Sequence, residues 1–167
     1  MSVTFEELLE RDGHFIYKTR GRSMEPMLRQ DRDLVVISSP SSRLKRFDVA
    51  LYRRGEAYVL HRVIKATDGC YIIRGDNTYT DETVPESAVI GVLSSFQRKG
   101  RQISTESRGY RLYVRLWLAI YPIRRAVIAV LRRAAGTAKR LRAARAAKKR
   151  PDKNEPAGGK KTEKKQQ

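Results

Sequence analysis

The chain has 167 residues, of which 40% are hydrophobic, so it can bury one modest core. Its net charge of +18 is uneven: residues 106–167 hold 19 Lys and Arg against 4 Asp and Glu, whereas residues 1–105 hold 17 against 14. One cysteine excludes an intramolecular disulfide, and one cysteine with two unclustered histidines argues against a zinc site. No metal or cofactor is therefore expected, and the basic character belongs to an appendage.

The first 105 residues alternate short strand-like runs with turns. Thr4 and the acidic residues that follow it predict a short capped helix, which ends at Asp12-Gly13. Strand-like runs follow at 14–19, 34–38, 47–52, 57–67, 70–74 and 89–97. Such closely spaced strands with short turns predict a mainly β, mostly antiparallel domain with a short amino-terminal helix.

A turn between the first two strands carries a candidate nucleophile. Residues 21–28 read Gly-Arg-Ser-Met-Glu-Pro-Met-Leu, and Gly21 and Pro26 favour a turn in which the Ser23 hydroxyl is accessible. A turn serine more commonly caps a nearby amide. As a nucleophile at neutral pH, Ser23 needs a base from elsewhere in the chain.

His61 is the candidate base. It lies in the run 57–67 on the face that also carries Val59 and Val63, and therefore points toward the core. A histidine among valines is often only a buried core residue. With Ser23 present we interpret it as a general base, because an imidazole accepts a proton near neutral pH.

An acidic side chain is expected to orient the imidazole. Asp76 and Asp81 flank the loop 77–80, and either carboxylate could stabilise the charged histidine. Asp76 could instead shape the loop, as an Asp before Asn in a turn commonly does.

These motifs run in an order that resembles the type I signal peptidase family, over roughly residues 15–97. They are Ser23 to Pro26, Asp33 to Val36, His61 to Val63, and Gly75 to Asp81. Because histidine stands where bacterial members usually have lysine, the chain is most similar to the serine–histidine branch of endoplasmic-reticulum, archaeal and sporulation enzymes. The resemblance implies an acyl-enzyme on Ser23, with the acid at the end of the loop: Asp81, or Glu82 if the alignment slips by one residue.

The carboxyl-terminal third is expected to contain a helical segment, 106–147, and a disordered Lys-rich tail, 148–167, after a domain of residues 1–105. Within it, residues 108–133 interleave aromatic and aliphatic residues with arginines and predict a basic amphipathic helix. No signal peptide is evident at the amino terminus, and no uncharged stretch is long enough to span a bilayer.

We expect residues 108–150 to bind an anionic membrane surface peripherally, on a side that the sequence does not specify. The alternative is that the amphipathic helix packs on its own domain.

The sequence as a whole predicts a serine endopeptidase that cleaves signal or leader peptides from a protein or peptide precursor. One alternative is a self-cleaving regulator similar to the SOS repressors, whose basic tail binds nucleic acid. That alternative is less favoured, because those proteins use lysine as the base and because too few residues precede the first strand for a helix-turn-helix. Another is an inactive membrane-surface adaptor.

Overall fold

The computed structural model describes residues 3–130. Of these, residues up to Tyr121 form one compact unit, and residues 122–130 belong to a second. The predicted tail, 148–167, and the part of the predicted helix beyond residue 130 lie outside the described residues.

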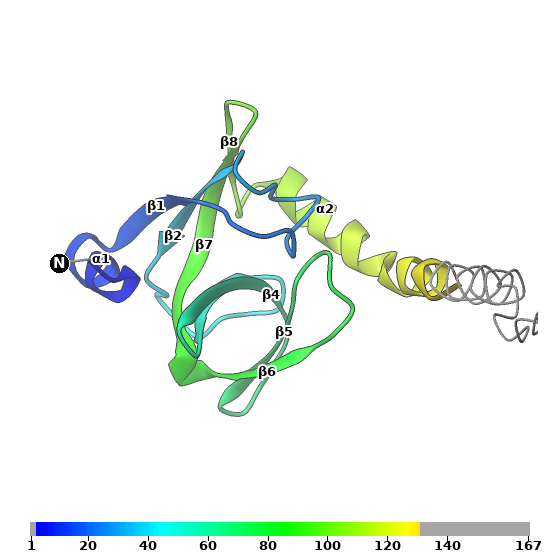
Figure 1. The fold of residues 1–167 in the computed structure, drawn as a ribbon, viewed down its shortest axis with the longest axis horizontal. Helices are drawn as coiled ribbons and strands as arrows, with labels where there is room; N and C mark the ends of the chain where they lie inside the picture. The colour runs from blue at the N-terminus through cyan, green and yellow to red at the C-terminus, as the bar shows by residue number, and fades with distance from the viewer. Residues whose placement is uncertain (1–2, 131–167) are drawn as a thin grey trace, which may run out of the picture. The chain divides into compact units, whose positions relative to one another are not determined.

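The first unit is a curved, antiparallel β half-barrel with a short helix before it (Figure 1). Its elements are α1 (Phe5–Asp12), β1 (His14–Lys18), β2 (Leu34–Ser38), β3 (Val49–Arg54), β4 (Ala57–Thr67), β5 (Cys70–Arg74), β6 (Glu82–Pro85), the 3-10 turn η1 (Glu86–Ala88), β7 (Val89–Arg98), β8 (Arg101–Ser104) and α2 (Arg108–Ala119). A further helical stretch follows at residues 121–130. The strands are ordered β1-β2-β7-β3-β4-β5-β6, and β8 also pairs with β7. The predicted mainly β class is confirmed.

Local signals explain most element boundaries. Thr4 caps α1, since its hydroxyl accepts a hydrogen bond from the Glu7 amide, and Gly13 ends the helix at a φ of 71°. β3 begins later than the predicted run 47–52, because Phe47 adopts a φ of 87° in the turn that leads into the strand. The short strand β6 was not predicted from the sequence.

Strand β4 separates two buried clusters. Leu60 belongs to the larger cluster, whereas Val63 belongs to the smaller one, which also contains Tyr52. Residues between them are buried on both faces: His61 is 5% exposed and Arg62 is 0% exposed. At the centre of β4, therefore, buried and solvent-exposed residues do not alternate along the strand.

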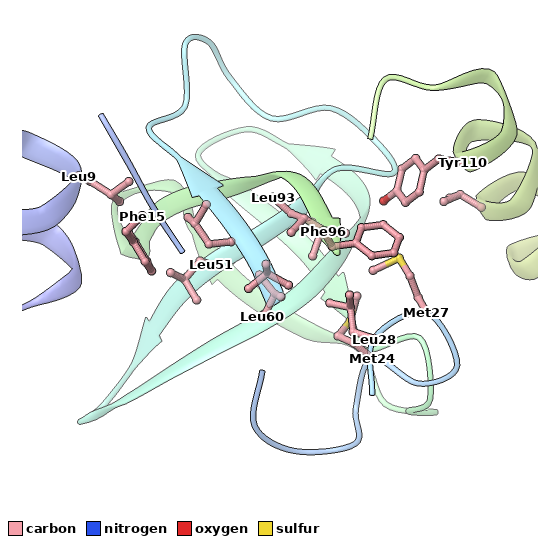
Figure 2. Close-up of a cluster of buried hydrophobic side chains, with 14 residues drawn as sticks. Leu9, Phe15, Met24, Met27, Leu28, Leu51, Leu60, Leu93, Phe96 and Tyr110 are labelled. Atoms are coloured by element: carbon pink, nitrogen blue, oxygen red, sulfur yellow. The ribbon is translucent and has the colours of Figure 1, made fainter. Parts of the chain in front are cut away.

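The larger cluster anchors the turn that carries Ser23. Met24, Met27 and Leu28 are buried in it, and Figure 2 shows their side chains gathered near Phe96 at one end of the cluster. Burial of each side chain of this size stabilises the folded protein by about 1.5–3 kcal/mol. The residues just after the serine therefore fix the turn to the domain.

Helix α2 packs on the half-barrel through one face. Tyr110 and Val114 are buried in the larger cluster, whereas Leu112, Leu116 and Ile120 remain exposed. The expectation that this helix could pack on its own domain thus holds for the inner face of α2. Within residues 3–130, no helix is both long and apolar enough to span a membrane.

Candidate active site

Ser23 lies half-buried in a tight turn between β1 and β2. Gly21 adopts a φ of 82°, which glycine tolerates without strain, and the Glu25–Pro26 peptide bond is cis. The Glu25 amide donates to the Arg22 carbonyl oxygen over 3.2 Å. Within residues 3–130, neither the hydroxyl nor the backbone amide of Ser23 donates a hydrogen bond, so both groups are available to a ligand.

The loop at residues 75–81 packs against this turn and forms hydrogen bonds with its backbone. The Asn77 amide donates to the Ser23 carbonyl oxygen over 2.7 Å, and the Asn77 side chain donates to the Arg22 carbonyl oxygen over 3.2 Å. A Cβ atom at Gly75 would lie 2.7 Å from the Ser23 carbonyl oxygen, closer than real contacts allow. Residue 75 must therefore be glycine for the loop to approach Ser23 so closely.

Ser23 and His61 line the same cleft, which has a volume of about 890 Å³. Aromatic side chains from α1, β1 and β4 form part of its wall: Phe5, Tyr17 and Tyr58. Within the described residues the serine and the imidazole are not hydrogen-bonded to each other. Catalytic hydrogen bonds are often long in unliganded enzymes and tighten when a substrate binds.

Tyr52 connects His61 to an acidic side chain. Its hydroxyl donates to Glu82 Oε2 over 2.8 Å and lies 3.2 Å from His61 Nδ1. A phenol has one proton, and since Glu82 accepts that proton, the oxygen can only accept from the imidazole. His61 therefore carries its proton on Nδ1, which leaves the Nε2 lone pair free to accept a proton.

The burial and charges of this site set two pKa values. Burial lowers the pKa of His61 below its usual value, and the nearby Glu82 carboxylate offsets this only in part. Burial also disfavours the charged form of Glu82, but the Tyr52 hydrogen bond and the positive charge of Arg54 outweigh it and hold the pKa of Glu82 below its usual value. Near neutral pH the site thus combines a neutral imidazole with an ionised carboxylate.

The three candidate acids have different neighbours. Glu82, at the start of β6, lies 3.8 Å from His61 Nδ1 and accepts from Arg54 Nη1 over 2.9 Å. Asp81 instead forms an ion pair with Arg74, in which Arg74 Nη2 donates over 2.8 Å. Only Glu82 of these two adjacent residues faces the imidazole.

Asp76 is buried in a separate ion pair with Arg62, at 2.7 Å, and both side chains are 0% exposed. Burial alone lowers the pKa of Arg62, but the Asp76 carboxylate outweighs it and raises that pKa above its usual value. Arg62 also donates to the Phe47 carbonyl oxygen and to Met27 Sδ. The pair thus ties the loop at Asp76 to the turn that carries Ser23.

Sequence reasoning did not identify Tyr52 or Arg54. Both lie on β3, which pairs with β4 so that Ala50 is opposite His61 and Tyr52 is opposite Val59. Tyr52 is therefore diagonal to His61 on the same face of the sheet. The strong hairpin signal at Gly55 could have located Tyr52, because the hairpin fixes which residues of β3 and β4 lie opposite each other. No cluster of three metal-ligating side chains occurs within residues 3–130.

A comparison with known families gives a match. A family model described as "Peptidase S24-like" matches residues 2–94, which is more than half of the chain and includes Ser23, His61 and Glu82. No curated protein gives a match. The family is part of the superfamily that contains the LexA repressor and signal peptidases, and its domain is that of a serine peptidase. The chain belongs to the peptidase S24-like family.

Proposed function

We propose that the protein is a serine endopeptidase that cleaves signal or leader peptides from protein or peptide precursors, with Ser23 as nucleophile and His61 as general base. The observation that carries the proposal is the hydrogen-bonded series from His61 through Tyr52 to Glu82, in the cleft that Ser23 lines. This series leaves His61 Nε2 as a proton acceptor, which is what a serine nucleophile requires.

In the proposed reaction, Ser23 Oγ bonds to the scissile carbonyl carbon while its proton moves to His61 Nε2. The carbonyl oxygen becomes an oxyanion, for which the backbone amide of Ser23 is a donor. The C–N bond then breaks, and the leaving amine takes the proton from His61. A water molecule, deprotonated by His61, hydrolyses the ester and restores the Ser23 hydroxyl.

The proposed acidic partner is Glu82, acting through the Tyr52 hydroxyl, in place of Asp81. The carboxylate of Glu82 stabilises the imidazolium that forms during the reaction, and the tyrosine holds the imidazole in the required tautomer. Asp81 is occupied by Arg74, and its side chain is 45% exposed to solvent. A charge screened in that way contributes little to a neighbouring proton transfer.

Labelling with a serine-directed fluorophosphonate probe tests the nucleophile. We expect the parent protein to be labelled, and the Ser23→Ala and His61→Ala variants not to be. Ser41→Ala is a matched control, because Ser41 lies in an exposed loop. Labelling that persists in Ser23→Ala would contradict the assignment, and a parent protein that is not labelled would instead favour an inactive adaptor.

Cleavage of a synthetic leader peptide with small residues before the scissile bond tests the substrate class. The alternative, self-cleavage similar to that of the SOS repressors, is supported by the same family match. Self-cleavage is first order and independent of protein concentration, whereas cleavage of a separate peptide follows the concentration of enzyme. Salt-dependent binding of duplex DNA would further favour the regulator.

We also propose that the protein binds an anionic membrane surface through the outer face of α2. Three aliphatic side chains, Leu112, Leu116 and Ile120, are 59%, 58% and 41% exposed there. Arg111 and Arg115 are exposed on the same helix and can contact lipid phosphates.

Sedimentation with phosphatidylserine vesicles tests this association. We expect Leu116→Glu to reduce the bound fraction, because it places a negative charge on the face proposed to enter the lipid. Ile16→Glu is the matched control, since Ile16 is 62% exposed on β1, away from the helix. Equal loss of binding in both variants would contradict a specific role of α2.

A further inference from the structure

Helix α2 lies beyond the part of the chain that the family model matches. It nevertheless contacts the loop 75–81, which packs against the Ser23 turn. Trp117 Nε1 donates to the Asp76 carbonyl oxygen over 3.2 Å. The Tyr110 hydroxyl accepts from Arg62 Nη1 over 2.9 Å, and Arg62 in turn holds the Asp76 carboxylate. Two polar contacts thus join the helix to both the backbone and the side-chain partner of Asp76.

A third contact with the loop comes from Tyr121, two residues after the end of α2. The rings of Tyr79 and Tyr121 stack with centroids 5.9 Å apart, and the Arg74 guanidinium lies 3.8 Å from the Tyr121 ring centroid. The positions 110, 114, 117 and 121 follow the spacing of one helical face. The same face that buries Val114 in the core therefore also carries Tyr110 and Trp117.

The loop in turn holds the turn that carries the nucleophile. The Asn77 amide donates to the Ser23 carbonyl oxygen, and Gly75 lies directly against Ser23. A shift of the loop would therefore move the backbone of the reacting serine. Because misplacement of a nucleophile by about 1 Å can cost about a hundredfold in rate, such a support matters for catalysis.

We propose that α2 is a positioning element of the active site, in which Trp117 and Tyr110 hold the loop 75–81 against the Ser23 turn. This inference rests on the proposed function, because it assigns Ser23 as the nucleophile. Neither residue touches the cleft, so both act through the loop. A helix that only covered the core would need apolar contact such as that of Val114, and not the two polar contacts with the network around Asp76.

Trp117→Phe separates these two roles, because it keeps an aromatic ring but removes the N–H that donates to Asp76. Tyr110→Phe is the second variant, since it removes only the hydroxyl that accepts from Arg62. Arg108→Gln is the control, because Arg108 is exposed at the start of the same helix. Each variant is made in the full chain and compared by fluorophosphonate labelling and by amide hydrogen exchange at Asn77.

We expect Trp117→Phe and Tyr110→Phe each to lower kinact by about three- to tenfold with KI unchanged, the range that corresponds to loss of one hydrogen bond. The Asn77 amide should exchange faster by a similar factor, and Arg108→Gln should match the parent in both measurements. A parental kinact in both variants overturns the inference whatever the exchange rate. If the parent protein itself is not labelled, the proposed function fails, and Asn77 exchange alone decides whether α2 holds the loop.

Discussion

The Tyr52 hydroxyl lies 3.2 Å from His61 Nδ1, and it directs its own proton to Glu82. The imidazole is therefore held by a neutral group, with the carboxylate one hydrogen bond further away. This arrangement sets the tautomer of His61 without a direct hydrogen bond between His61 and Glu82. Tyr52 is therefore the central residue of the candidate site, although no sequence motif identified it.

Tyr52→Phe should lower the rate of Ser23 labelling by about ten- to a hundredfold, since a hydrogen bond to a charged group is worth about 1.5–3 kcal/mol. The fold should survive, because the ring remains in place. Tyr71→Phe is the matched control: Tyr71 is buried in the same cluster, and its hydroxyl bonds to the Leu44 amide, away from the cleft. Labelling rates that are equal in the two variants would exclude Tyr52 from the proposed mechanism.

Glu82→Gln and Asp81→Asn form a pair of neighbouring substitutions that identify the acid. We expect Glu82→Gln to reduce labelling at least tenfold, because the imidazolium then loses its nearest carboxylate. Asp81→Asn should stay within about twofold of the parent, since Asp81 bonds to Arg74 at the surface. If, with the same probe, Asp81→Asn reduced labelling more than Glu82→Gln did, Asp81 would be the acid instead.

The pH profile of labelling should report the lowered pKa of His61. Only the neutral imidazole accepts the serine proton, so labelling falls as pH drops through the pKa of the folded protein, and the half-maximal rate lies below about pH 6.5. The charge of Glu82 raises this pKa and that of Arg54 lowers it. Glu82→Gln should therefore shift the midpoint down and Arg54→Gln should shift it up; shifts in the same direction would contradict the assignment.

The lowered pKa of His61 also links stability to pH. Between the pKa of the folded state and that of the unfolded chain, the unfolded chain binds more protons at this site. The contribution of His61 to the free energy of unfolding is therefore complete above the unfolded pKa and decreases as the pH falls below it.

Asp76→Asn should destabilise the fold strongly, because it leaves Arg62 charged and fully buried without its partner. Breaking a buried pair in this way costs about 3–5 kcal/mol, which urea unfolding measures directly. Arg11→Gln is the comparison, because the side chains of Arg11 and its partner Asp12 are 66% and 44% exposed and such pairs contribute about 0.2–1 kcal/mol. A similar loss of stability in both variants would show that burial does not determine how much the Arg62–Asp76 pair contributes to stability.

Much of the fold follows from local signals in the sequence. Turn residues such as Gly13 and Gly69 end α1 and join β4 to β5, and β-branched runs mark the long strands, so most elements begin and end within a few residues of their predicted positions. Gly21 and Pro26 likewise identify the Ser23 turn, because their conformational preferences act over a few residues only. The candidate nucleophile and the candidate base could therefore be proposed from the sequence.

The identity of the acid and the role of α2 depend on contacts between distant parts of the chain. Strand β6 has four residues and includes Pro85, so no hydrophobic period marks it, and its pairing with β5 is what brings Glu82 rather than Asp81 toward His61. Tyr52 reaches His61 through the register of β3 on β4. Trp117 reaches Asp76 only because α2 folds back onto the domain. Such pairings are set by the packing of the whole domain, which no short stretch of sequence encodes.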